Sequence, residues 1–151
     1  ALQSLAPTPD GLYLIAADLS HCLRRIEIHA GDVVTWVGQC GTASYSDATG
    51  TSAGFSAVTH AAIDTGAATV YVTDRDNERI RSAPLATAAV ATFIGDGTKA
   101  YLEGTGTGAH LAQPITIAVS VSRGLILWAD SFSGNSRIRQ VTMSGAVTSL
   151  V

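Results

Sequence analysis

The sequence DRDNERIR at residues 74–81 returns in a longer form as DSFSGNSRIR at residues 130–139. Each copy follows a short apolar run, VYVT at residues 70–73 and ILWA at residues 126–129. An apolar run that ends in an acidic, polar segment is typical of a strand entering a turn. The two copies therefore indicate one strand–turn–strand element that the chain uses twice.

A weaker third copy lies near the start of the chain, where LIAA at residues 14–17 leads into Asp18 and then into CLRRI at residues 22–26. Asp18, Asp74 and Asp130 are separated by 56 residues in both steps. A fixed spacing of this size is typical of repeat proteins, whose units stack on their neighbours to bury an apolar face. We therefore interpret the chain as three repeat units.

The composition is that of a compact, turn-rich protein. Of 151 residues, 46% are hydrophobic, only 14% are charged and 15 are glycine. The formal net charge is −3 and Lys99 is the only lysine, so no general basic field attracts a phosphate backbone, and we expect no nucleic-acid partner. No apolar run approaches the roughly 20 residues that span a bilayer, so we expect no membrane insertion. The chain starts without Met, and we expect a segment of a longer protein.

Within each unit, four short apolar segments are separated by turns, and no segment shows the 3.6-residue stripe of a helix. The expected strands are residues 2–6, 12–17, 23–28 and 33–37, then 58–63, 70–73, 79–83 and 90–94, and then 115–119, 125–129, 137–142 and 146–150. The repeats of this single domain span about residues 2–38, 58–95 and 115–151, with inter-blade loops at residues 38–57 and 95–114. This pattern predicts an all-β fold, a β-propeller segment of three four-stranded antiparallel blades.

The two long loops belong to the repeat, because their residues also correspond at a spacing of 56. Tyr45 corresponds to Tyr101, and Asp47 corresponds to Glu103. Tyrosine on a loop supplies contact area with a polar tip, which suits recognition of a protein or a glycan. These four residues are the candidate binding residues. The alternative is that the tyrosines only cover the neighbouring blade.

The repeated pattern resembles the NHL repeat, and the resemblance covers nearly the whole chain. The middle and last units match it through Asn77, Arg79 and Ile80 and through Asn135, Arg137 and Ile138. The first unit departs from it, with Ser20 or His21 in place of Asn and Cys22 in place of Arg. The resemblance implies a β-propeller, which in this family typically has six blades.

Three blades cannot close a ring, and an open propeller exposes strand edges and an apolar flank. The expected partners are therefore other propeller blades. They belong either to the rest of a longer chain, which we favour, or to a second copy that completes six blades as a homodimer.

Aspartates and arginines recur together at the turn of each unit. Because a carboxylate at a strand end can accept backbone N–H bonds and pair with an arginine on the next strand, we expect a structural role in turns and pairing. The residues in question are Asp18, Asp74, Asp130, Asn77, Asn135, Arg24, Arg81 and Arg139.

The two cysteines, Cys22 and Cys40, flank a predicted hairpin. If residues 30–32 form a three-residue loop, His29 faces Val33 and the cysteines pair directly; a two-residue loop puts them out of register by one. We expect a disulfide, with two separate thiols as the alternative. The bridge would place the protein in the secretory pathway or outside the cell, whereas free thiols would leave a cytoplasmic location open.

Relatives of the NHL propeller include lyases with a metal held by inner-strand histidines and lactonases with inner-strand acids. Here only His60 lies on an inner strand, and its equivalent is Thr116; Asp64 is the one candidate acid, and its equivalent is Ser120. We therefore expect no catalytic residues, no metal and no cofactor.

The function that the sequence favours is a non-catalytic interaction scaffold that recognises a protein or a glycan. The first alternative is a propeller enzyme of the lyase or lactonase type. The second is an RNA-binding module that uses Arg75, Arg79, Arg81, Arg137 and Arg139, although Asp74, Asp76, Glu78 and Asp130 neutralise much of this patch.

Overall fold

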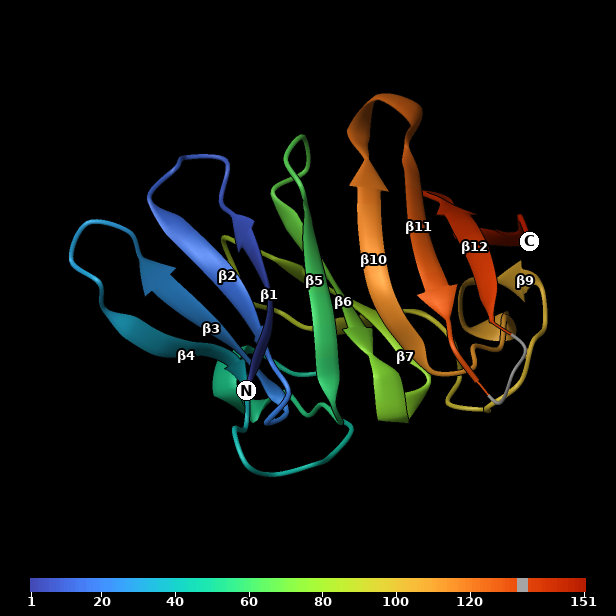
Figure 1. The fold of residues 1–151 in the computed structure, drawn as a ribbon, viewed down its shortest axis with the longest axis horizontal. Coiled ribbons are helices and arrows are strands. Elements are labelled where there is room, and N and C mark those ends of the chain that lie inside the picture. The colour runs from blue at the N-terminus through green and yellow to red at the C-terminus, as the bar shows by residue number, and fades with distance from the viewer. Residues whose placement is uncertain (133–135) are drawn as a thin grey trace.

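The computed structural model describes residues 1–132 and 136–151, which form three antiparallel sheets that follow one another across the molecule (Figure 1). We call the sheets blades. Blade 1 consists of β1 (Leu2–Pro7), β2 (Tyr13–Asp18), β3 (Cys22–Glu27) and β4 (Val33–Gly38). Blade 2 consists of β5 (Val58–Asp64), β6 (Thr69–Asp74), β7 (Arg79–Pro84) and β8 (Ala91–Ile94). Blade 3 consists of β10 (Pro114–Ser120), β11 (Leu125–Asp130), β12 (Arg137–Thr142) and β13 (Ala146–Ser149).

Each blade is an up-and-down meander in which consecutive strands pair. The remaining elements are the short strand β9 (Gly104–Thr105) and four 3-10 turns, η1 (Gly50–Ser52), η2 (Arg75–Asn77), η3 (Gly106–Gly108) and η4 (Val121–Arg123). The expected strands are all found, with ends that differ by at most one residue, and the predicted all-β fold of three blades is confirmed. No helix in the described residues is long and apolar enough to cross a membrane.

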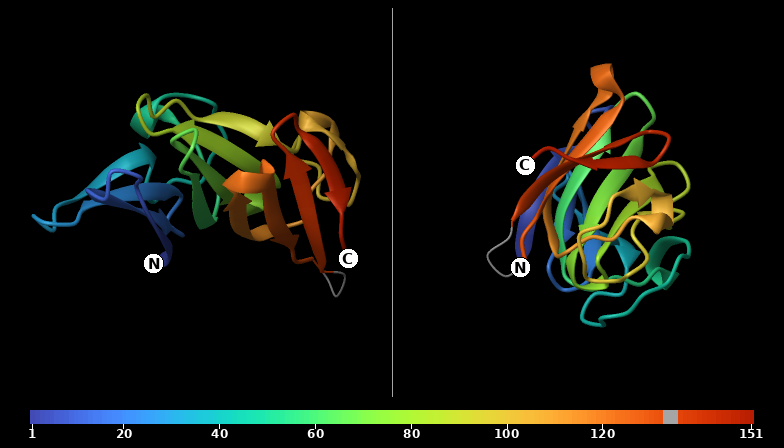
Figure 2. Two further views of the ribbon diagram at one scale, coloured as in Figure 1. Left: turned by 90° about the horizontal axis from the view of Figure 1, so that it is seen from above. Right: turned by 90° about the vertical axis from the view of Figure 1, so that its right-hand side faces the viewer.

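The repeat extends to the irregularities of the sheets. The pairing of the first two strands shifts register at Leu2/Ser4 in blade 1, at Val58/His60 in blade 2 and at Pro114/Thr116 in blade 3. These first strands are the innermost ones, and β5 lies between β1 and β10 (Figures 1 and 2). The three blades therefore share one geometry, not only one strand count.

The apolar core lies between the blades. One buried cluster joins blade 1 to blade 2, and a second joins blade 2 to blade 3. Each cluster receives a fully buried side chain from the long loop that separates its two blades, Phe55 in the first and Leu111 in the second. These two residues are themselves 56 positions apart, so the loops supply core as well as connection.

The sequence predicted a loop without strands at residues 95–114, but this loop contains a short strand. Its strand β9 pairs with β13, through Thr105 opposite Ala146 and Gly104 opposite Val147, and blade 3 gains a fifth strand at its outer edge. In blade 2, the equivalent contact is an isolated bridge between Thr49 and Ala89. Each loop therefore borders the outer strand of the blade that follows it.

The predicted register of the β3–β4 hairpin is wrong. Val33 pairs with Ile26 and not with His29, and a bulge follows between Leu23 and Arg24. Cys22 therefore lies opposite Gly38, and Cys40 lies beyond the end of β4. The hairpin loop is longer than three residues because Glu27 N–H bonds to Asp32 O across it, which shifts every pair that follows.

Candidate functional site

A buried ion pair stands at the same corner of blades 2 and 3. Asp74 Oδ2 lies 2.8 Å from Arg81 Nη1, and Asp130 Oδ2 lies 3.1 Å from Arg139 Nη1; all four side chains are fully buried. The geometry follows from the sheet, because Arg81 is two residues from Arg79, the backbone partner of Asp74, and alternate residues of a strand share a face. The sequence thus places the acid and the guanidinium on one side of the blade.

Burial raises the pKa of Asp74, and hydrogen bonds from Asn77, from the Ser56 N–H and from Arg81 oppose this effect. Burial likewise raises the pKa of Asp130 against the bonds from Arg139 and Trp128. Because arginine is a permanent cation, each buried carboxylate has a compensating charge in contact with it. Asn77 also donates to Ser44 O at 2.8 Å, whereas its predicted counterpart, Asn135, lies outside the described residues.

The loop of the preceding blade completes each pair. Arg81 donates to Ser46 O and Gly54 O, each at 3.0 Å. Arg139 donates to Leu102 O at 2.7 Å and to His110 O at 2.6 Å. The two pairs of carbonyls stand at equivalent positions of the two loops, 56 residues apart. One guanidinium therefore fixes the loop at two points of its backbone.

The candidate carboxylates of the loops also contact the following blade. Asp47 pairs with Arg81 and accepts a hydrogen bond of 3.1 Å from Thr92 N–H, and Glu103 accepts one of 2.8 Å from Ser149 N–H. Burial raises the pKa of Asp47, but the bonds from Thr92 and Arg81 outweigh it and lower the pKa. Both carboxylates hold the loop to the fourth strand of the blade meander, β8 in blade 2 and β13 in blade 3.

The candidate tyrosines stack on arginines of the same blades. The Tyr45 ring lies 3.9 Å from the Arg79 guanidinium carbon, and its hydroxyl is 3.0 Å from Thr92 Oγ1. The Tyr101 ring lies 4.5 Å from the Arg137 guanidinium carbon. Tyr45 is still 48% exposed. The tyrosines therefore cover the neighbouring blade, and Tyr45 keeps half of its surface for other contacts.

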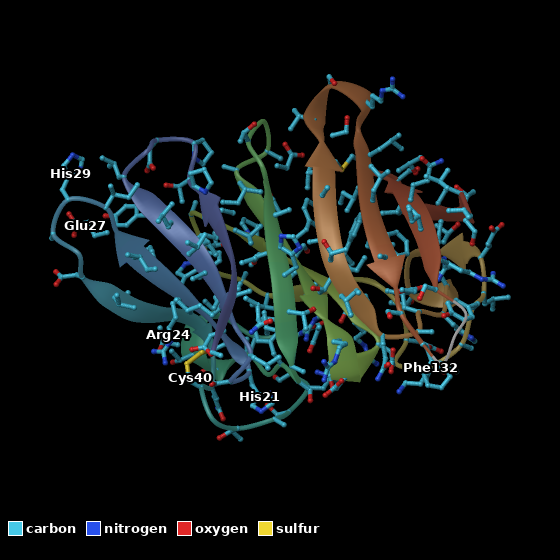
Figure 3. The ribbon with its side chains drawn as sticks, viewed as in Figure 1. His21, Arg24, Glu27, His29, Cys40 and Phe132 are labelled. Atoms are coloured by element: carbon cyan, nitrogen blue, oxygen red, sulfur yellow. A yellow bond between two sulfur atoms is a disulfide. The ribbon has the colours of Figure 1, made fainter. Side chains whose placement is uncertain are left out.

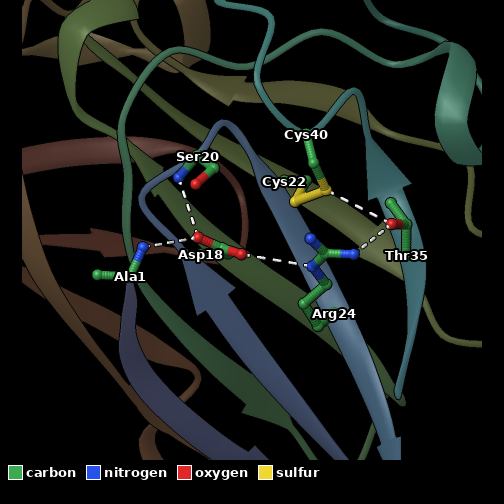
Figure 4. Close-up of a disulfide and its surroundings, with 7 residues drawn as sticks. All are labelled: Ala1, Asp18, Ser20, Cys22, Arg24, Thr35 and Cys40. Atoms are coloured by element: carbon green, nitrogen blue, oxygen red, sulfur yellow. Dashed lines mark hydrogen bonds and ion pairs between the residues drawn. A yellow bond between two sulfur atoms is a disulfide. The ribbon is translucent and has the colours of Figure 1, made fainter. Parts of the chain in front are cut away.

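Blade 1 carries the same pair in a more open form (Figure 4). Arg24 Nε donates to Asp18 Oδ2 at 3.3 Å, and its Nη1 donates to Thr35 Oγ1 at 2.8 Å. Partial burial works to raise the pKa of Asp18, but the bonds from Ser20, from the Ala1 amine and from Arg24 outweigh it and lower the pKa to about 2. The Arg24 side chain is 30% exposed.

The disulfide between Cys22 and Cys40 is confirmed, with Cα atoms 5.0 Å apart, and it stands beside this pair (Figures 3 and 4). It forms although Cys40 lies beyond β4, because Gly38 turns the chain with a φ of 90°. A Cβ at Gly38 would lie 2.8 Å from His21 O, so no other residue fits there. In blade 2 the position of Cys22 belongs to Arg79, which donates to Asn77 O and Asp96 O.

Two residues that the sequence did not predict as site residues connect the blades. His21 Nδ1 accepts a hydrogen bond of 2.9 Å from Ala57 N–H, and Glu78 Oε2 accepts one of 2.5 Å from Gln113 N–H. Burial raises the pKa of Glu78, against the Gln113 bond and its ion pair with Lys99. The two residues differ in type. The only signal in the sequence that relates them is their position, one residue before the third strand of a blade.

The inner-strand candidates for chemistry have local partners. His60 Nδ1 lies 2.8 Å from Thr116 Oγ1, and burial lowers the pKa of this histidine. Asp64 Oδ1 accepts from Gly66 N–H at 2.8 Å and from Ala67 N–H, which makes it part of a turn. Within residues 1–132 and 136–151, no three His, Cys, Asp or Glu side chains are grouped as a metal site requires.

Comparison with solved structures identifies the fold. A chain of a nidogen/laminin complex matches with a TM-score of 0.74 and 20% identity over 99% of this chain and 48% of its own. An auxiliary nutrient binding protein from Bacteroides thetaiotaomicron matches with a TM-score of 0.72 and 22% identity, over 83% of this chain and 34% of its own. A proposed phosphatase from the same organism matches with a TM-score of 0.69 and 17% identity, over 83% of this chain and 31% of its own.

The likeness is one of fold, and it assigns the chain to the β-propellers. The chain spans about half of the nidogen/laminin chain and about a third of the other two. No protein-family description matches the sequence, and the comparison with curated proteins gives no match.

Proposed function

We propose that the chain is a non-catalytic interaction scaffold on an NHL-type propeller and that its loop end binds a protein or a glycan. The observation that carries the proposal is the state of Tyr45. Its ring is fixed by Arg79 and Thr92 while half of its surface is exposed. An aromatic side chain that is already held in place loses little conformational entropy when a ligand binds it, which favours affinity.

Other exposed apolar groups lie on the loops at the same end of the blades. Leu102, which follows Tyr101, is 48% exposed. Phe132 lies at the end of blade 3 where the loops gather, with Lys99 Nζ 4.8 Å from its ring centre (Figure 3). Aromatic and apolar groups bordered by cations are typical of the centre of a recognition surface.

The structural neighbours support a binding role in general terms, because one belongs to a protein complex and another is a nutrient binding protein. The proposed phosphatase among them keeps an enzyme as the alternative. The RNA-binding alternative loses two of its five arginines, since Arg81 and Arg139 are fully buried, and Arg75 is paired with Asp76.

The disulfide supports an oxidising compartment, the secretory pathway or the exterior of the cell. The expected ligand is therefore a secreted or cell-surface protein or its glycan.

The test is a binding screen of the disulfide-intact protein against arrays of secreted proteins and of glycans. The Tyr45→Ala/Tyr101→Ala variant is expected to lose at least about tenfold in affinity for any ligand found, because truncating a central aromatic group typically costs ≥ about 1–2 kcal/mol. Tyr13→Ala is the matched control, since Tyr13 stacks on Arg25 at 4.8 Å in blade 1, away from both loops. Equal binding by the double variant and the parent would contradict the proposal, as would turnover of ester or phosphate substrates.

A further inference from the structure

Blade 1 exposes a face that the other two blades bury. Blades 2 and 3 pack one face of their sheet on the preceding blade, and we call this the leading face. In blade 2 its residues include Val58, Ala61 and Val90, all at most 4% exposed. The equivalent residues of blade 1, by strand register, are Leu2, Leu5 and Val33, which are 53%, 57% and 57% exposed. An exposed apolar face of this kind marks an interaction site.

The corner of blade 1 is open in the same direction. Arg81 and Arg139 each bind two carbonyls of a preceding loop and are fully buried. Arg24 occupies the equivalent position and is 30% exposed, and within the described residues no loop carbonyl accepts a bond from it. Two of its neighbours are in place, since Asp18 and Thr35 correspond to Asp74 and Thr92.

We propose that Arg24 and the leading face of blade 1 form a docking site for one specific kind of segment, a loop of the type seen at residues 38–57 and 95–114. The segment brings two backbone carbonyls to the guanidinium of Arg24, a carboxylate to the edge of β4 and an apolar side chain to the exposed face. This inference does not depend on the ligand proposed for the loop end. It follows from the two occupied corners of the same chain.

The equivalence of the blades also indicates which occupant fits the docking site. The opposite flank of a second copy, around Ile138 and a shallow apolar hollow of about 170 Å³ beside Leu127 and Trp128, would cover the apolar face. It would not supply the carbonyls, because both loops of this type in the chain already lie on blades 2 and 3. A further repeat unit that carries its own loop satisfies both requirements.

One feature of the segment is relaxed. Tyr45 and Tyr101 stack on Arg79 and Arg137, and Cys22 stands at that position in blade 1. A tyrosine of the incoming loop therefore lacks this stacking partner and meets only Arg24, whose equivalent, Arg81, lies 4.9 Å from the Tyr45 ring. The docking site depends more on the carbonyls and the carboxylate than on the aromatic ring.

The test adds a copy of residues 38–56 in front of Ala1, so that Ser56 of the copy precedes Ala1 as the native Ser56 precedes Ala57. Cys40→Ser in the copy keeps the native disulfide alone. Chemical denaturation and the NMR signal of the Arg24 Nε–H group are then compared with and without the added segment. The segment is expected to slow exchange of that proton with solvent at least tenfold and to raise the denaturation midpoint.

Two matched variants separate docking from a general effect of the extension. The factor by which Arg24→Gln raises the unfolding constant is expected to be at least ten times larger in the protein with the segment than in the protein without it. Asp47→Asn in the copy is expected to reduce this difference. An equal effect of Arg24→Gln in both proteins would overturn the proposal. A homodimer of the unextended protein that dissociates on Leu5→Asp would also overturn it, because a second copy would then be the occupant.

Discussion

His21 and Glu78 occupy the same place in successive blades, and each accepts a hydrogen bond from the residue just before the first strand of the next blade. Both have left-handed backbones, with φ of 72° and 54°. Their acceptors differ in chemistry, an imidazole nitrogen and a carboxylate, but their partners, Ala57 N–H and Gln113 N–H, are equivalent. The contact between blades therefore depends on the position of an acceptor and not on one residue type.

We expect His21→Ala to destabilise the junction of blades 1 and 2 by about 1–2 kcal/mol, since the Ala57 amide loses its acceptor. His21→Asn is the matched control, because asparagine tolerates a left-handed backbone and offers an acceptor oxygen. Denaturant unfolding and hydrogen exchange at Ala57 measure the effect. If both variants behave alike, the hydrogen bond is not the cause.

Arg81→Gln is expected to cost about 3–5 kcal/mol, because it leaves Asp74 buried without a compensating charge. Arg24→Gln removes the equivalent side chain from an open corner and is expected to cost only about 0–1 kcal/mol. Chemical denaturation of both variants gives the comparison. Similar losses in the free energy of unfolding would show that burial does not determine how much the ion pair stabilises the protein.

The disulfide closes a loop with a sequence separation of 18 residues. Reduction, or the Cys22→Ala/Cys40→Ala variant, is expected to lower the free energy of unfolding by about 3 kcal/mol. Thermal unfolding with and without reductant measures the loss. Thiol titration of the denatured, unreduced protein should find no free thiol, and two thiols would contradict the bridge.

The lowered pKa of Asp18 predicts a loss of stability in acid. A carboxyl group whose pKa falls on folding, here from 3.8 to about 2, stabilises the protein above pH 3.8, and that contribution is lost as the pH falls through about 2. Allowing for solvent screening of this partly exposed group, we expect about 1 kcal/mol. Asp18→Asn should lack this part of the pH profile, measured by denaturation between pH 5 and 2. An unchanged profile would contradict the assignment.

The sequence was sufficient for the blades, because they follow from spacing and local alternation. It also predicted the disulfide, but through a pairing of Cys22 with Cys40 across the hairpin that the structure does not have. It was not sufficient for the register of β3 and β4, since neither the bulge at Leu23/Arg24 nor the longer hairpin leaves a mark in the residue pattern. The spacing also related Asp47 to Glu103 but not to Thr92 or Ser149, which lie in another blade. Contacts across blades depend on how two sheets stack, and no local pattern encodes that.

The placement of the long loops gives the array a direction. Each of the two loops leaves one blade and completes the buried arginine of the next one. Removing residues before a blade therefore uncovers its ion pair, whereas removing residues after it leaves that corner intact. During synthesis, the loops that complete blades 2 and 3 leave the ribosome before the blades themselves, so these two blades can be completed in the order of their synthesis.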